Sequence, residues 1–146
     1  MARTTTYLNF MGNTEQAFTF YKSVFQTEFI GGIRRMRDMP AGPGMPQLSE
    51  AEQNMIMHVA LPILGGHVLM GTDALESMGH TLTVGTNISI NLEPDTREET
   101  ETLFRALAVG GKATMDLQDM HWGGYFGLLT DKFGIQWMFN CGAPKA

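Results

Sequence analysis

The 146-residue sequence is poor in several features that would direct it to particular classes of protein. Its single cysteine, Cys141, excludes an internal disulfide and cannot by itself form a thiolate zinc cluster. No apolar run approaches the roughly 20 residues of a membrane helix, and the first ten residues lack the apolar segment of a signal peptide. We therefore expect a cytoplasmic protein that has no membrane partner.

Positive charge is also scarce. Ten Lys and Arg residues against fifteen Asp and Glu residues give a formal net charge of −5, and the basic residues form no long stripe. Because nucleic-acid binding depends on neutralising phosphates, we expect no nucleic-acid partner. A hydrophobic fraction of 43% with 17% charged residues is instead typical of a globular protein, and the length suffices for a single domain, residues 1–146.

Periodicity in the first half predicts a strand at 7–10, a helix at 14–25 and strands at 29–36, 55–63 and 67–73. Asn13 is the expected N-cap of the helix, with Gln16 as the return partner of a capping box. Residues 38–53 are rich in proline and glycine, so they should form a surface loop, either a lid over a site or a segment of tolerated variation. The predicted buried stripe of the helix is Ala17, Phe20, Tyr21, Val24 and Phe25.

The second half repeats this order. It predicts a helix that starts after Asp95, with Glu98 closing the capping box, and strands at 86–92, 112–117, 125–129 and 135–141. The two predicted N-caps, Asn13 and Asp95, are 82 residues apart (95 minus 13). We infer an internal duplication of a βαβββ module, residues 1–75 with the loop 38–53 and then residues 85–146. The side chains expected to be buried here are Ile88, Ile90, Leu92, Leu103, Phe104 and Leu107.

The C-terminal stretch predicts a hairpin. Asp131 should accept hydrogen bonds from local amides, and Gly134 should take the positive φ that the turn requires. Alternation in the last strand places Ile135, Trp137, Phe139 and Cys141 on one face, with Gln136, Met138 and Asn140 on the other.

Four segments of the chain carry a resemblance to a known family: YLNFMGNTEQAFTFYKSVF at 7–25, MHVAL at 57–61, GGHVLMGTD at 65–73 and WGGYFGLLTDKFGIQWMFNC at 122–141. Through them the chain resembles the PhnB-like branch of the vicinal oxygen chelate superfamily, which includes glyoxalases, bleomycin resistance proteins and dioxygenases. The resemblance implies an α+β fold in which two βαβββ modules form a cup of antiparallel-rich mixed sheet. It also implies a homodimer.

Enzymes of this superfamily hold a divalent metal with His and Glu residues on the first and last strands of the modules. Borderline and hard ions need imidazole or carboxylate ligands, which thioether and amide side chains do not replace. The resemblance therefore predicts no metal site of the usual kind and no cofactor, with a divalent metal held by other residues as the alternative. The residues matched to the ligand positions are Thr6 or Tyr7, Met70 or Gly71, residues 87–89, and Met138.

Two functions of the cup fit this resemblance, and a third possibility is that methionines fill the cup and the protein acts through its dimer surface. The first is metal-free binding of a small molecule in the cup, where aromatic and acidic side chains would favour a cationic ligand. The second is a metal-dependent or acid–base enzyme of the lyase, isomerase, dioxygenase or transferase class, with His58 or His121 as the catalytic residue. Some PhnB-like sequences are labelled quinone methyltransferases, but this chain has no glycine-rich strand-to-helix loop to hold a methyl donor. The side chains expected to contact a ligand are Asn9, His58, Trp122, Tyr125, Gln136 and Met138.

Overall fold

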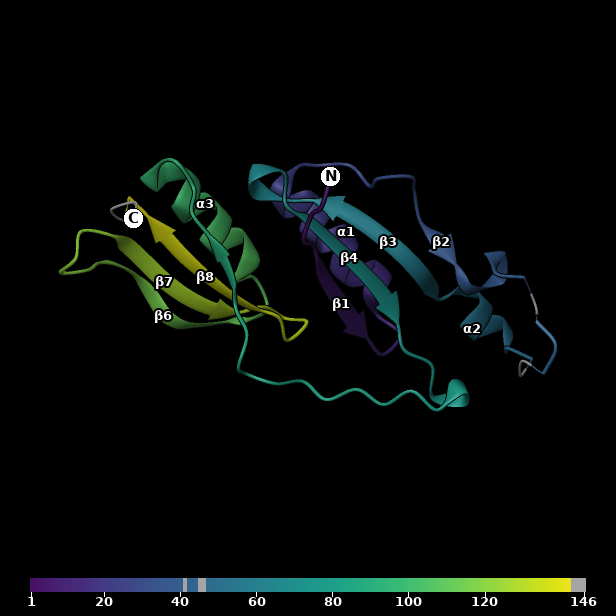
Figure 1. Cartoon of the computed structure of the whole chain (residues 1–146). Coiled ribbons are helices and arrows are strands. Elements are labelled where there is room, and N and C mark those ends of the chain that lie inside the picture. Colours follow the sequence, from purple (N-terminus) through teal and green to yellow (C-terminus); the bar gives the residue numbers. More distant parts are fainter. Residues whose placement is uncertain (41, 45–46, 143–146) are drawn as a thin grey trace. The chain divides into compact units, whose positions relative to one another are not determined.

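The structure is a computed structural model that describes residues 1–40, 42–44 and 47–142. The chain divides into two compact units, Met1–Thr83 and Val84–Ala146, and each contains a four-stranded mixed sheet with a helix on one face (Figure 1). The predicted α+β fold with two βαβββ-like modules is confirmed. No helix in the described part of the chain is both long and apolar enough to cross a membrane.

The sheet of the first unit has the strand order β1-β4-β3-β2, in which β1 is parallel to β4 and the other neighbours are antiparallel. Short helical segments occupy the connections: the 3₁₀ turns η1 (Met36–Asp38), η2 (Leu64–Gly66) and η3 (Glu76–Met78), and the helix α2 (Glu50–Asn54). The principal elements are β1 (Thr6–Phe10), α1 (Thr14–Phe25), β2 (Arg34–Arg35), β3 (Ile56–Pro62) and β4 (Val68–Asp73).

Helix α1 covers one face of this sheet. Phe18 lies over Gly71 of β4, where an added Cβ would come 2.4 Å from the Phe18 ring, so the glycine permits the close approach of helix and sheet. The predicted stripe is wrong in part, because Phe20, Val24 and Phe25 are half-buried. We call the opposite side of the sheet the distal face. The residues that α1 buries fully are Thr14, Ala17, Phe18 and Tyr21.

The start of α1 is held by a residue that is distant in sequence. Asn13 is at the N-cap position but makes no side-chain cap hydrogen bond, so the predicted capping box is wrong. The Asp73 carboxylate, 3% exposed at the end of β4, takes this role instead. Its Oδ1 accepts from the backbone amides of Gly12 and Thr14 and from the Thr14 hydroxyl, at 2.6–3.1 Å. Its Oδ2 accepts from the amide of Ile56 at 2.8 Å.

The predicted strand at 29–36 shortens to the two residues of β2. Gly31 and Gly32 have φ values of 72° and 75°, which are incompatible with extended pairing. The predicted loop at 38–53 includes residues 41, 45 and 46, which lie outside the described residues. Its described part contains the start of α2, which Ser49 and Glu52 begin with a reciprocal capping box.

The sheet of the second unit has the order β5-β8-β7-β6, with β5 parallel to β8. The strand predicted at 86–92 forms only over its last three residues, and Ile88 is 75% exposed rather than buried. Leu92 and the predicted helix stripe of Leu103, Phe104 and Leu107 are buried as expected. The elements are β5 (Ile90–Leu92), α3 (Arg97–Leu107), β6 (Lys112–Asp119), β7 (Tyr125–Thr130) and β8 (Gln136–Cys141).

Helix α3 begins one residue later than its predicted cap implied. Thr96, not Asp95, is the N-cap, and its hydroxyl accepts from the Glu99 amide at 3.1 Å. The Glu99 carboxylate in turn accepts from the amide of Asp95 at 3.2 Å, so Glu99 replaces the predicted Glu98 as the return partner.

The C-terminal hairpin has the predicted chemistry. Oδ1 of Asp131 accepts from the amides of Phe133 and Ile135, and Gly134 has a φ of 89°. The other oxygen, Oδ2, accepts from the indole nitrogen of the fully buried Trp137 at 2.8 Å. The alternation of β8 is also confirmed, with Trp137, Phe139 and Cys141 buried under α3 and the intervening side chains half-exposed. Ile135, predicted on the same face, precedes β8 and is half-buried.

Candidate functional site

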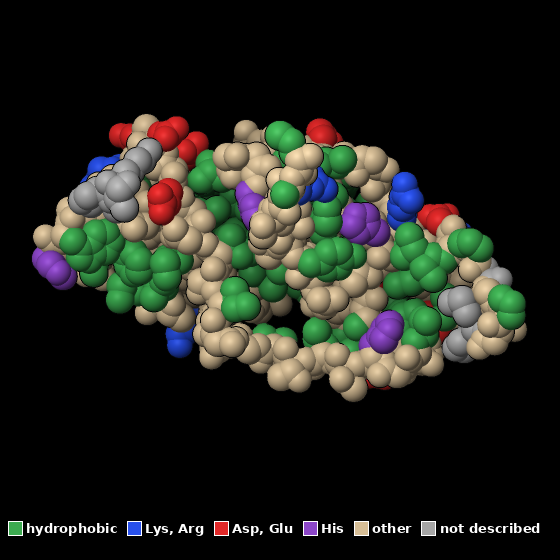
Figure 2. Space-filling view, viewed as in Figure 1, with side chains coloured by type: hydrophobic (Ala, Val, Ile, Leu, Met, Phe, Trp, Pro, Cys, Tyr) green, Lys and Arg blue, Asp and Glu red, His purple; other side chains and the backbone are tan. Residues whose placement is uncertain are grey.

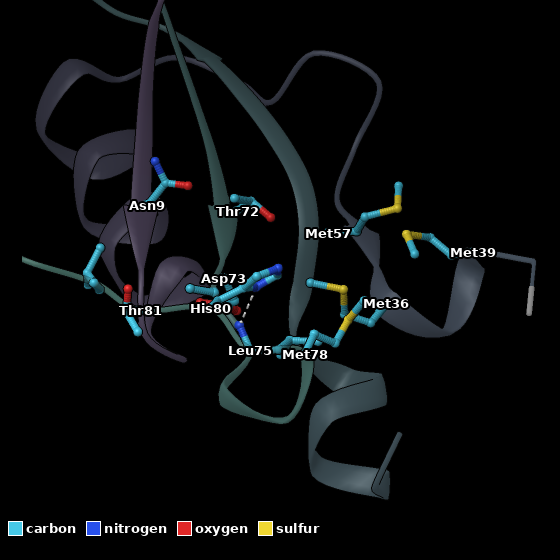
Figure 3. Close-up of a pocket in the computed structure, with 12 residues that line it drawn as sticks. Asn9, Met36, Met39, Met57, Thr72, Asp73, Leu75, Met78, His80 and Thr81 are labelled. Atoms are coloured by element: carbon cyan, nitrogen blue, oxygen red, sulfur yellow. Dashed lines mark hydrogen bonds between the residues drawn. The ribbon is translucent and has the colours of Figure 1, made fainter. Parts of the chain in front are cut away.

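The first unit contains a cavity of about 600 Å³ at the C-terminal ends of β1 and β4. Cavities of this volume are in the range of sites that bind small molecules. Its walls come from the distal face of the sheet, from η1 and from the segment 74–82 that follows β4 (Figure 3). Segments far apart in the sequence therefore converge on one hollow.

The floor of the cavity is set by strand alternation. Leu8 and Phe10 of β1 point under α1, so Asn9 between them points to the distal face. Asn9 pairs in register with Thr72 of β4, which places two short polar side chains next to each other. The Thr72 hydroxyl donates to the carbonyl of Ile56 at 3.3 Å, which leaves its oxygen lone pairs as acceptors toward the cavity.

Methionine forms much of the wall. Met57 reaches the cavity because of an irregularity in β3: Arg34 pairs with His58 and Arg35 with Ile56, so no β2 residue lies opposite Met57. Ile56 is thereby buried at 1% exposure, while Met57 is half-exposed. The methionines that line the cavity are Met36, Met39, Met57 and Met78 (Figure 3).

His80 is fixed at the rim of the cavity. Its Nδ1 accepts a hydrogen bond from the backbone amide of Leu75 at 2.9 Å. A ring nitrogen that accepts must be unprotonated, so the ring in this arrangement is neutral and carries its proton on Nε2. In Figure 3 the ring extends from the Leu75 backbone toward the interior of the group of lining residues. The Nε2–H group is thus a hydrogen-bond donor at this edge of the cavity.

Asp73 is the acidic residue of the lining, but its oxygens are already engaged. The four hydrogen bonds that hold the start of α1 and the start of β3 use both carboxylate oxygens. The same contacts occupy the amides at the N-terminus of α1, where an anionic group would otherwise bind. Asp73 therefore has a structural role, and it occupies the amides of Gly12 and Thr14 at this helix terminus.

His58, a predicted catalytic candidate, lies on the distal face of the same sheet. Its Nδ1 is 3.1 Å from the hydroxyl of Tyr7, and the two rings are 5.9 Å apart between centroids. Burial raises the pKa of Tyr7. Tyr7 and Asn9 are both on the outward side of β1, so the Tyr7–His58 pair is a near neighbour of the cavity floor.

The predicted contact residues of the second unit are divided between two faces of its sheet. Tyr125 lies on the side of α3, where its hydroxyl donates to Glu101 at 3.0 Å and its ring stacks 3.8 Å below the guanidinium of Arg97. Gln136 and Met138 are on the other face, and the amide of Gln136 donates to the Ile88 carbonyl at 2.7 Å.

Trp122 and His121 precede β7 in the second unit. The ring of Trp122 contacts Phe126 edge-on at 5.7 Å, on the face that also carries Gln136 and Met138. His121 is exposed. Asp119, two residues before His121, forms an ion pair with Arg97 at 2.6 Å, and this contact lowers the pKa of Asp119. Of the two histidine candidates, His58 is therefore the one with a defined hydrogen-bond partner.

The residues at the metal positions of the superfamily do not fit a divalent ion. The distal face of the first sheet presents Tyr7 and Asn9 on β1 and Met70 and Thr72 on β4, while β8 presents Met138. No three His, Cys, Asp or Glu side chains of the described residues lie close enough together to hold a metal. Within the first unit, the histidines visible in Figure 2 lie apart from one another.

Among the side chains that the sequence predicts as ligand contacts, Asn9 is the one that lines this cavity, and the other lining residues were not among those predicted. Met36, Met39 and Met78 belong to 3₁₀ turns and loops, which have no hydrophobic periodicity to mark them. Thr72 follows the motif GGHVLMG directly, and its parity with Asn9 was a readable signal once β1 and β4 were paired.

Comparison with known proteins gives a consistent result over almost the whole chain. The profile of a family described as 3-demethylubiquinone-9 3-methyltransferase matches residues 2–139. Protein YjdN of Escherichia coli strain K12 is 31% identical over 139 residues, which are 92% of this chain and 91% of that protein.

Solved structures with similar folds include two proteins of about the same sequence identity and one more distant protein. Protein PA1353 from Pseudomonas aeruginosa has a TM-score of 0.80 at 31% identity, covering 97% of this chain and 98% of its own. The PhnB protein from Bacillus cereus has a TM-score of 0.73 at 30% identity, covering 96% and 99%. A glyoxalase/bleomycin resistance protein/dioxygenase family enzyme from Burkholderia phytofirmans PsJN has a TM-score of 0.63 at 21% identity over 94% and 97%, which establishes a shared fold.

Proposed function

The chain belongs to the family described as 3-demethylubiquinone-9 3-methyltransferase, with the fold of the glyoxalase/bleomycin resistance/dioxygenase proteins, and we propose that it binds a small molecule in the cavity of its first unit without the usual metal ion. The observation that carries this proposal is the composition of the cavity. A volume of about 600 Å³ is lined by four methionines and by Asn9, Thr72 and His80. An adaptable apolar wall with a few polar groups is typical of a ligand site.

Methionine methyl NMR on the whole chain tests this proposal. A library of neutral, cationic, planar and phosphonate compounds would be titrated into protein labelled at the methionine ε-methyl groups. We expect at least one compound to shift the signals of Met36, Met39, Met57 and Met78 before those of the other eight of the twelve methionines. If no compound shifts these four signals, or if shifts are centred elsewhere, the proposal is wrong.

Variants sharpen the assignment to this cavity. Met57→Arg should abolish binding, because the guanidinium brings a charge into an apolar wall. Met57→Gln, which is neutral and of similar length, should weaken binding while retaining the fold. Met11→Arg is the matched control, since Met11 is 39% exposed and is not part of the cavity lining. Equal binding by Met57→Arg and Met11→Arg would place the ligand outside the cavity.

The methyl transfer named in the family description would need a site for a methyl donor. The strand-to-helix connection of the first unit is short, and Asp73 occupies the amides of Gly12 and Thr14 there. This arrangement favours ligand binding over the binding of a nucleotide-like donor at that helix terminus. The same titration with S-adenosylmethionine checks this point, and we expect no change in the cavity signals.

A second candidate function is acid–base catalysis at His58. It is favoured by the 3.1 Å contact between the Tyr7 hydroxyl and His58 Nδ1, next to the cavity floor. Compounds that bind would be incubated with the protein and recovered for mass analysis. If the compounds are recovered unchanged, the result favours a binding protein. Conversion that is lost in His58→Gln, while the methionine signals still report binding, favours the enzyme.

A further inference from the structure

We propose that the ligand of this cavity is a neutral aromatic compound that carries a hydroxyl group on one edge. This inference rests on the proposed binding function and specifies the class of ligand. Three features of the lining support it: the arrangement of the thioethers, the state of the charged groups, and the position of the hydrogen-bonding side chains.

The thioethers favour an aromatic ring over a saturated one. Methionine sulfur is polarizable and makes favourable contacts with the edges of aromatic rings, and the unbranched side chain adapts its shape to a flat surface. Four of the twelve methionines of the chain line this one cavity. They come from three separate segments: η1 with the residue after it, β3, and η3 (Figure 3). A planar ligand would thus meet sulfur atoms supplied by more than one wall.

The charged groups favour a neutral ligand. Asp73 is the one acidic residue among the lining residues that the structure describes, and its carboxylate accepts four hydrogen bonds from the protein. None of these described lining residues is Lys or Arg. A cation would find no available carboxylate and an anion no basic side chain, so a charged ligand would lose hydration without compensation. This conclusion differs from the cationic ligand expected from the sequence.

The polar side chains define where the hydroxyl group lies. The Nε2–H of His80 is a donor at the rim, since Nδ1 is engaged with the Leu75 amide. Thr72 offers oxygen lone pairs on the floor, and the Asn9 amide beside it offers both a donor and an acceptor. A hydroxyl oxygen can accept one hydrogen bond and donate another, which matches this combination.

The test compares four compounds with the same bicyclic ten-carbon skeleton by titration of the full-length chain at neutral pH. They are 2-naphthol, its saturated analogue decahydro-2-naphthol, the cation 2-naphthyltrimethylammonium and the anion 2-naphthyl phosphate. We expect 2-naphthol to bind about 3-fold to 10-fold more tightly than the saturated analogue, because each sulfur–aromatic contact is of that order. The two charged compounds should bind at least about 10-fold more weakly than 2-naphthol.

Variants attribute the preference to the lining. Replacing Met57 and Met78 together by Leu keeps the apolar volume but removes sulfur, so the advantage of 2-naphthol over its saturated analogue should fall to about 2-fold or less. Met115→Leu, in the second unit, is the matched control and should leave the advantage unchanged. His80→Phe should weaken the binding of 2-naphthol. It should leave the binding of naphthalene, which lacks the hydroxyl group, unaffected.

Several outcomes would overturn the inference. If the saturated analogue binds as tightly as 2-naphthol or more tightly, the preference for an aromatic ligand is refuted. If either charged compound binds more tightly than 2-naphthol, the preference for a neutral ligand is refuted. If none of the four binds while another compound shifts the cavity methionines, the ligand class is wrong but the binding function stands. If no compound of the wider library shifts those methionines, the binding function itself fails.

Discussion

The two units share one fold, but the hydrogen bonds of their buried aspartates span very different separations in the sequence. In the first unit, Asp73 joins the end of β4 to the start of α1, 59 residues away, and to the start of β3. In the second unit, Asp131 closes a turn and binds Trp137, six residues further on. The comparison shows that one duplicated architecture can be held by a long-range contact in one copy and by a local contact in the other.

Removal of the two carboxylates should give the largest effects. Asp73→Ala leaves four donors without their acceptor and should lower the free energy of unfolding of the first unit by about 3–5 kcal/mol. Asp131→Ala leaves two amides and the Trp137 indole without their acceptor. It should lower the free energy of unfolding of the second unit by about 2–3 kcal/mol. Hydrogen exchange resolved by peptide reports each unit separately. Exposed Asp116→Ala is the control and should change stability by less than about 0.5 kcal/mol. A larger effect at Asp131 than at Asp73 would contradict the comparison.

Glycines under the helices provide the next comparison. An added Cβ at Gly71 would lie 2.4 Å from Phe18, whereas one at Gly127 of β7 would lie 2.9 Å from Phe104 and Leu117. We expect Gly71→Ala to destabilise its unit by about 2–3 kcal/mol and Gly127→Ala by about 1–2 kcal/mol, measured by denaturant unfolding. Phe18→Leu should partly rescue Gly71→Ala, since the smaller side chain relieves the overlap. Absence of any rescue would show that the strain arises elsewhere.

The helix caps should differ in the opposite sense. Thr96→Ala removes the hydroxyl that accepts from Glu99 and should destabilise the second unit by about 1 kcal/mol. Asn13→Ala should have less than about 0.5 kcal/mol of effect, because the Asn13 side chain makes no cap hydrogen bond. Thermal unfolding of both variants checks this prediction. Equal losses would indicate that Asn13 caps α1 in solution.

Surface ion pairs should give the smallest effects. Arg35 donates hydrogen bonds to both oxygens of Glu15 and holds the pKa of Glu15 below its ordinary value of 4.5. A lowered pKa in the folded state means that the stabilisation is complete above pH 4.5 and disappears as the pH falls through the folded value.

Because the Glu15 side chain is 48% exposed, solvent screening limits this contribution to about 0.2–1 kcal/mol. Unfolding of wild type and Glu15→Gln at pH 7 and pH 3 should show a difference at pH 7 that is lost at pH 3. In the second unit, Asp119→Asn tests the more exposed pair with Arg97 and should change stability less than Glu15→Gln. A difference that grows on acidification would reverse the assignment for Glu15.

Local patterns account for what the sequence predicted correctly. Both long helices, the hairpin around Asp131 and the alternation of β8 depend on residues within one turn or one strand of each other. The capping box of Ser49 and Glu52 was equally local and was overlooked because prolines and glycines dominate the surrounding segment. Phe18 was omitted from the stripe of α1, although its spacing from Thr14 and Tyr21 fits helical periodicity.

Long-range contacts account for most of what was missed. Nothing near Asp73 in the sequence indicates that it binds the start of α1. The cavity depends on the pairing of β1 with β4 and on turns that bring distant methionines together, and neither has a periodic signature. For Asn9, strand alternation alone fixes the direction of the side chain, away from the buried Leu8 and Phe10.

The buried thiol of Cys141 makes the chain its own reporter. It is 5% exposed at the end of β8, a strand flanked by β5 and β7, and it is the only cysteine of the sequence. A thiol reagent can reach it only when the end of that strand detaches or the sheet opens. The rate of modification therefore measures how often the second unit opens locally. No engineered label is needed, and the unit that contains the methionine cavity contributes no signal.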